Sequence, residues 1–125
     1  MSKKVAIAVV AALLGFIGVS SASAHTVLIA SSPAKNAVVN SLPATISLSF
    51  ADPLLTLGKH VINKVVVTDP MKMVISGTAN KVKGAVLTNT LSDSMPMSGK
   101  YLVSYRVSAE DGHIVTGQFT FTLKN

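Results

Sequence analysis

The chain has 125 residues, of which 49% are hydrophobic and 5% aromatic, with a formal net charge of +6 and no cysteine. This length supports one domain with one core, and the lack of cysteine excludes a disulfide framework and a thiolate metal site. The basic residues are scattered singly between few aromatics, which is not the pattern of a nucleic-acid-binding protein. A general attraction to anionic membrane surfaces remains an open interpretation of the charge.

Residues 1–24 have the three zones of a cleaved export signal. Two lysines precede an apolar run over Val5–Val19, and Ala22-Ser23-Ala24 supplies the small–x–small pattern that signal peptidase requires. The apolar run is shorter than the roughly 20 residues needed to span a bilayer. The sequence therefore predicts a cleaved signal peptide and a soluble periplasmic domain over residues 25–125, which begins at His25.

The rest of the chain alternates with period two and is interrupted by Pro, Gly, Asn and Asp, as is typical of short β-strands. The predicted strands, in chain order, are Thr26–Ala30, Thr45–Ala51, Val61–Thr68, Met73–Ser76, Lys83–Thr90, Tyr101–Ser108 and Gly117–Lys124. The alternation points Ile46, Leu48, Phe50, Phe119, Phe121 and Leu123 inward. About seven such strands without an amphipathic helix predict an all-β fold, either a β-sandwich or a small Greek-key barrel.

Histidine 25 acquires special chemistry if the signal is cleaved before it. A free α-amino group titrates near about pH 8, so a metal ion displaces its proton at modest cost. The amine and the imidazole Nδ1 of His25 can then close a chelate ring on one cation. The alternative interpretation is a solvated, frayed terminal residue.

A second candidate ligand pair lies in the stretch Glu110-Asp111-Gly112-His113. If this stretch is extended, Asp111 and His113 point to one side, and Gly112 leaves the space between them open. With His25 they make a set of three nitrogens and one oxygen, which suits a tetragonal Cu(II) site. The alternative is an ordinary turn with a surface histidine.

With these motifs, the sequence resembles the CopC-type periplasmic copper-binding proteins. The resemblance rests on the cut before His25 and on the segments HTVLIASSPAKNAVV, PATISLSFADP and GKYLVSYRVSAEDGHIVTGQFTFTL. It implies a small cupredoxin-like, immunoglobulin-like Greek-key β-barrel. It also implies one Cu(II) ion held by the amine and imidazole of His25 together with Asp111 and His113. Asp52 stands near where many members have a glutamate, and whether it assists the site is left open.

Some members of that family also carry a methionine-rich loop that holds Cu(I), for which thioethers are suitable ligands. Met71 and Met73 fall in the comparable region, and Met95 and Met97 lie in a later loop. The denser cluster of those members is absent, and the alternative is a set of gap-filling or exposed methionines beside turns. His60 is interpreted as a solvated loop residue.

The resulting hypothesis is a periplasmic copper-binding protein, not an enzyme, that sequesters Cu(II) or passes it to a partner. The resemblance implies an inner-membrane partner of the CopD type or another periplasmic copper carrier, and we expect a monomer that binds no nucleic acid. One alternative is a copper-dependent oxidative enzyme, because polysaccharide-cleaving monooxygenases also chelate copper through a terminal histidine. The other is a metal-free β-sandwich interaction module, which the fold alone permits.

Overall fold

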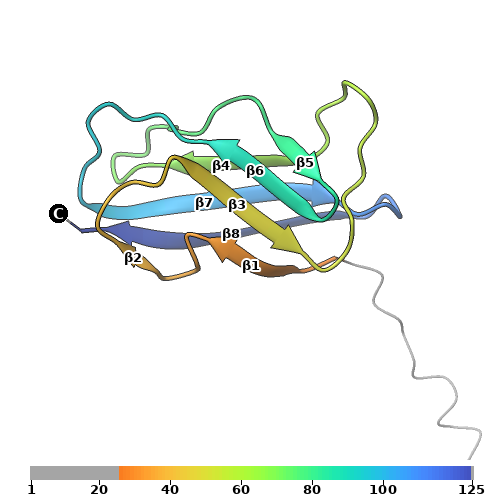
Figure 1. Cartoon of the computed structure of the whole chain (residues 1–125), viewed down its shortest axis with the longest axis horizontal. Helices are drawn as coiled ribbons and strands as arrows, with labels where there is room; N and C mark the ends of the chain where they lie inside the picture. Colours follow the sequence, from red (N-terminus) through yellow and green to blue (C-terminus); the bar gives the residue numbers. More distant parts are fainter. Residues whose placement is uncertain (1–25, 125) are drawn as a thin grey trace, which may run out of the picture.

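Two four-stranded sheets pack face to face in the structure, a computed structural model that describes residues 26–124 (Figure 1). One sheet has the order β1-β3-β6-β5 and the other has the order β2-β8-β7-β4. The strands are β1 (Leu28–Ser32), β2 (Val38–Val39), β3 (Thr45–Phe50), β4 (Lys64–Thr68), β5 (Lys81–Lys83), β6 (Val86–Thr90), β7 (Gly99–Ser108) and β8 (Ile114–Leu123). Nowhere in the described part of the chain does a helix have the length and apolar character that crossing a bilayer requires.

The alternating pattern read from the sequence places the core correctly. The six side chains predicted to point inward are all buried, with exposures from 0% to 6%. Across the β7–β8 pair, the rings of Tyr101 and Phe121 stack with centroids 5.2 Å apart. The Tyr101 hydroxyl donates a hydrogen bond to the Met97 carbonyl at 2.7 Å, so this buried polar group is satisfied.

The described chain forms eight strands rather than about seven: two strands are gained, and the predicted strand Met73–Ser76 is not formed. The predicted strand Lys83–Thr90 is split into β5 and β6, because Gly84 takes a φ of +60° in the tight turn between them. The additional strand β2 has only two residues and pairs in parallel with the end of β8. A pair so short leaves no periodic signal in the sequence.

The barrel alternative is wrong, because the edge of β4 meets an irregular segment and polar side chains instead of a further strand. The Val65 N–H donates to Asn80 Oδ1 at 3.1 Å, and the Val67 N–H donates to Ser76 Oγ at 2.9 Å. The predicted strand Met73–Ser76 accordingly makes only isolated bridges at Val74 and Ser76. Polar side chains that cap an edge stop further strand pairing, so the two sheets stay open as a sandwich.

Candidate metal centre

The stretch that contains Asp111 and His113 is the turn between β7 and β8, at one end of the sandwich (Figure 1). The Gly112 N–H donates to the Ala109 carbonyl at 2.9 Å, and the Ala109 N–H donates to the His113 carbonyl at 3.2 Å. Gly112 has a φ of +87°, a conformation that favours glycine. The expectation of an extended segment is therefore wrong, since the turn reverses the chain here.

The turn nevertheless brings the two predicted ligand side chains together. Asp111 Oδ1 accepts a hydrogen bond from the His113 backbone N–H at 3.0 Å, which is the geometry of an Asx-turn. Asp111 Oδ2 lies 2.8 Å from His113 Nδ1. The side chains are 34% and 57% exposed, respectively, so the pair is accessible from solvent.

The spacing of this pair suits two adjacent ligands of one metal ion. Nitrogen and oxygen ligands bind first-row divalent metals at about 2.0 Å. In a tetragonal site, neighbouring donors are at right angles and so lie about 2.8 Å apart. The Oδ2–Nδ1 separation in the turn has this value, although the two atoms now share a hydrogen bond that the side chains must open before both can bind the same ion.

The N-terminal segment is fastened at the same end of the sandwich. The Ala51 N–H donates to the Val27 carbonyl at 2.8 Å, and the Asp52 N–H donates to Thr26 Oγ1 at 3.1 Å. The loop that follows Asp52 in turn bridges to the start of the turn, through the pair Leu54–Ala109. These contacts connect the beginning of β1 with the turn that carries Asp111 and His113.

His25 itself, like the predicted signal peptide, lies outside the described residues. Within residues 26–124, no group of three His, Cys, Asp or Glu side chains gathers that could hold a metal. Asp111 and His113 are thus the two predicted ligands whose geometry the structure describes.

Thr26 is a functional candidate that the sequence reasoning missed. It is fully buried, and it borders a surface hollow with Tyr105 and Val115. Tyr105 packs edge-on against Phe50 with ring centroids 5.5 Å apart, and it covers Gly117 on the neighbouring strand. Burial raises the pKa of the Tyr105 hydroxyl. A threonine directly after His25 gives no signal of burial in the sequence.

The candidate Cu(I) ligands Met71 and Met73 lie in the turn after β4, which is held by Asp69. Asp69 Oδ1 accepts hydrogen bonds from the backbone N–H groups of both methionines, at 2.9 and 2.8 Å. Their side chains are 70% and 65% exposed. Pro70 packs directly over Gly99, so this turn lies beside the loop that contains Met97. The two methionine pairs therefore occupy neighbouring loops, at the end opposite to the turn that carries Asp111 and His113.

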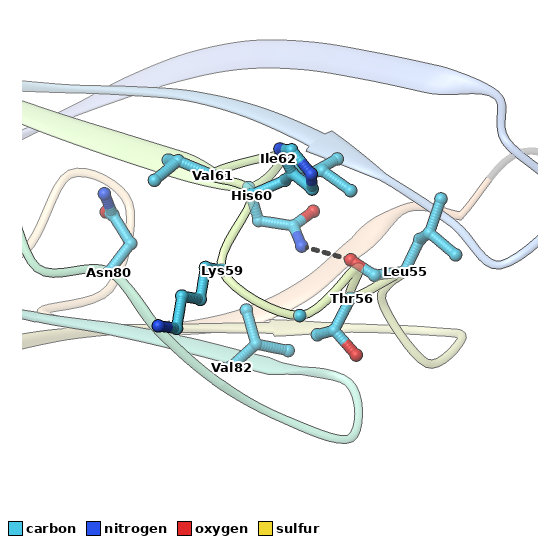
Figure 2. Close-up of a pocket in the computed structure, with 10 residues that line it drawn as sticks. Leu55, Thr56, Lys59, His60, Val61, Ile62, Asn80 and Val82 are labelled. Atoms are coloured by element: carbon cyan, nitrogen blue, oxygen red, sulfur yellow. Dashed lines mark hydrogen bonds between the residues drawn. The ribbon is translucent and has the colours of Figure 1, made fainter.

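His60 is an exposed loop residue, as the sequence indicated. It closes a turn in which its N–H donates to the Leu57 carbonyl at 3.0 Å. The loop forms one wall of a surface hollow and faces Asn80 and Val82 on the other side (Figure 2). Asn63 fastens the loop, because its Nδ2 donates to the Leu55 carbonyl at 2.7 Å.

The fold and the turn between β7 and β8 define a small β-sandwich protein with an accessible carboxylate–imidazole pair on a hairpin turn. The model of the CopC domain matches residues 28–124, so the chain belongs to the CopC domain family. It is 37% identical over 110 residues to copper resistance protein C from Xanthomonas campestris pv. juglandis, covering 84% of each chain.

Solved structures of the same fold agree with the sandwich. CopC from Methylosinus trichosporium OB3b matches with a TM-score of 0.68 at 24% identity, over 80% of this chain and 94% of that one. PcoC, a methionine-rich copper resistance protein from Escherichia coli, matches with a TM-score of 0.64 at 26% identity. That match covers 81% of this chain and all of the other.

Proposed function

We propose that this chain is a periplasmic copper-binding protein that holds one Cu(II) ion for sequestration or transfer. The proposed ligands are the amine and imidazole of His25, the carboxylate of Asp111 and the imidazole of His113. The observation that carries the proposal is the 2.8 Å approach of Asp111 Oδ2 to His113 Nδ1 in a turn beside the start of β1. Membership of the CopC domain family and the similarity to a copper resistance protein support it.

The donor set favours copper over other common metals. Three nitrogens and one oxygen suit the tetragonal geometry of Cu(II), which also stands highest among the divalent ions in intrinsic affinity. The chain has no cysteine to offer a site to softer, thiolate-bound ions.

A binding and transfer role agrees with the exposure of the pair. His113 is 57% exposed on a turn, so an incoming ligand can reach a metal held there without opening the core. We propose no catalysis, and we propose a monomer that receives or delivers copper through a CopD-type membrane protein or another copper carrier. The predicted signal over residues 1–24 supports the periplasm as its compartment.

The ligand assignment predicts that His113→Ala and Asp111→Ala each weaken Cu(II) binding by more than about tenfold. Changes to residues that only orient metal ligands already cost 10- to 100-fold. Affinity is measured by titration against a competing chelator, and the electron paramagnetic resonance spectrum is expected to change in both variants. The matched control is His60→Ala, which removes an exposed imidazole from a different loop. It should leave the Cu(II) affinity and the electron paramagnetic resonance spectrum unchanged.

Unaltered spectra in both site variants would contradict the assignment of Asp111 and His113. Both variants should keep the β-sheet circular dichroism of the parent, because these side chains are exposed and outside the core. An equal loss of affinity in His60→Ala would instead indicate unspecific binding to imidazoles.

Copper binding should also release protons. Imidazole and amine nitrogens must be deprotonated before they bind a metal, so protons compete with Cu(II). Affinity is therefore expected to fall as the pH drops from about 8 towards 5, the range in which such groups become protonated when free. The same chelator competition, repeated across this range, measures the slope. An affinity independent of pH would be incompatible with a site built from three nitrogens.

For Cu(I), we propose Met71 and Met73 as ligands at the opposite end of the sandwich. The exposure of both side chains and the neighbouring loop with Met97 support this second site. Thioether sulfur is a soft donor and prefers Cu(I) to Cu(II). The similarity to a methionine-rich copper resistance protein agrees with it.

A further inference from the structure

The strands of this sandwich carry only positive charge, whereas its loops carry both signs. Every charged residue on a strand is basic, namely Lys64, Lys81, Lys83, Lys100 and Arg106. All five acidic residues lie in loops at the two ends, namely Asp52, Asp69, Asp93, Glu110 and Asp111. Because the strands make up the two broad faces, the charged residues on the strands of these faces are all basic.

The sheet formed by β2, β8, β7 and β4 carries most of this charge on its outer side. Val65, Val67, Tyr101 and Val103 are buried, so the alternation points Lys64, Lys100 and Arg106 outward. Lys124 continues the outward series of β8 beyond Thr122 and is exposed. We refer to Lys64, Lys100, Arg106 and Lys124 as the basic face.

Two of these cations are direct cross-strand neighbours. Lys64 on β4 stands opposite Arg106 on β7, and both side chains are exposed. Like charges placed directly opposite in an antiparallel pair are destabilising. Neither side chain forms an ion pair with a carboxylate among residues 26–124. The fold therefore keeps an uncompensated positive pair that does not help it to fold.

We propose that the basic face docks on an anionic phospholipid bilayer. Its cations are spread over a sheet whose other outward groups include hydroxyls and amides, such as Thr68, Ser104, Thr116, Gln118 and Thr120. Scattered aliphatic side chains, such as Val38 and Ile114, lie between them. All described aromatic rings point inward, so the face lacks the aromatic anchors that dominate protein–protein interfaces. Dispersed lysines and an arginine without such an anchor fit the diffuse negative charge of lipid headgroups.

Docking in this way leaves the ends of the sandwich free. The strands β7 and β8 run along its length, and the turn that joins them projects from one end (Figure 1). The Lys64–Arg106 pair is two residue pairs away from the last pair before this turn, Ser108–Ile114. The face therefore holds the Asp111–His113 turn close to the lipid surface but not buried in it. The inference does not depend on the proposed copper site.

The test measures binding of the exported, processed protein to vesicles of phosphatidylglycerol and phosphatidylcholine by co-sedimentation. Intact mass first confirms that the apolar N-terminal segment has been removed, because this segment would itself bind lipid. Lys64→Gln/Arg106→Gln is expected to weaken binding by about thirtyfold, since each basic residue near an anionic surface contributes roughly one kcal/mol. Binding should also disappear at high salt and on vesicles of phosphatidylcholine alone.

The matched control is Lys81→Gln/Lys83→Gln, which removes the same charge from the other sheet. The residues Lys81 and Lys83 on β5 flank Val82, which packs against the core, so they face the opposite side. Packed sheets lie about 10 Å apart, beyond the screening length of about 8 Å at physiological salt. We therefore expect this control to change vesicle binding by less than about threefold.

A third variant separates docking from folding. Lys64→Glu places opposite charges across β4 and β7, so its thermal midpoint should rise above that of the parent while vesicle binding falls. An equal loss in the two Gln pairs would show that only net charge matters and would overturn the proposal. Retention on soluble poly-glutamate but not on anionic vesicles would show that the face serves an acidic protein and would overturn it too.

Discussion

A single glycine placed before His25 is expected to lower Cu(II) affinity by orders of magnitude. The extension turns the His25 nitrogen into a peptide amide, whose lone pair is delocalised and no longer binds a metal like an amine. The structure strengthens this expectation. Thr26 is fully buried and bonded to the Asp52 N–H, while the Val27 carbonyl accepts a hydrogen bond from Ala51. The chain therefore cannot slide by one residue to bring the new amine into position.

The experiment compares the processed and extended proteins by chelator competition and electron paramagnetic resonance. A glycine added after Asn125 is the matched control and should change neither measurement. Some copper binding to the extended terminus is expected, with a spectrum typical of a peptide site. Thermal stability of the metal-free protein should be unchanged by either extension. Equal affinity and identical spectra would show that the histidine at the cut is incidental, and the proposed site would have to be abandoned.

The variant Asn89→Leu is expected to lower the free energy of unfolding by about 3 kcal/mol, a large share of the stability of a small domain. Asn89 is 2% exposed on β6, and its Oδ1 accepts a hydrogen bond from the Gly77 N–H at 2.8 Å. Its Nδ2 donates to the Gly77 carbonyl at 2.8 Å and to Asn80 Oδ1 at 3.1 Å. Leucine has a similar volume but removes these three hydrogen bonds, so the Gly77 carbonyl loses its donor and the Gly77 N–H keeps only its bond to the Thr90 carbonyl at 3.0 Å.

The loss of stability should not be confined to β6, because Asn80 also accepts a hydrogen bond from the Val65 N–H at the edge of β4. Chemical denaturation, monitored by circular dichroism, measures the free energy of unfolding. Asn40→Leu makes the same change at an exposed loop position and should alter stability by less than about 0.5 kcal/mol. Similar stabilities for the two variants would mean that the amide network contributes little.

Much of the fold could be predicted from the sequence, because a strand with one buried face repeats every two residues. Ile46, Leu48 and Phe50 show this period, and all three are buried. The prediction was weaker where the strands are short or interrupted. At Gly84 a tight turn divides one apparent strand into two, and the two-residue strand β2 has no period to detect.

For the candidate site, the sequence could supply the chemical types of the proposed ligands but not their geometry. Asp111 and His113 were expected on one side of an extended segment, and the structure instead brings them together through a turn. The two side chains lie close together because of the Asx-turn, in which the Asp111 carboxylate accepts a hydrogen bond from the backbone N–H of His113. Local side-chain hydrogen bonds of this kind are not visible in hydrophobic periodicity.

The sequence by itself determined the all-β class, the residues of the core and the donors available for a metal. Only the tertiary structure decided that the sandwich stays open, since Asn80 and Ser76 cap the edge of β4. It also decided that Lys64 stands opposite Arg106, and that Thr26 is tied to the loop leading to the turn. The physical reason is that periodicity reports which side of a strand is buried. Contacts between distant strands depend on register and on side-chain hydrogen bonds, which form only when the sheets pack.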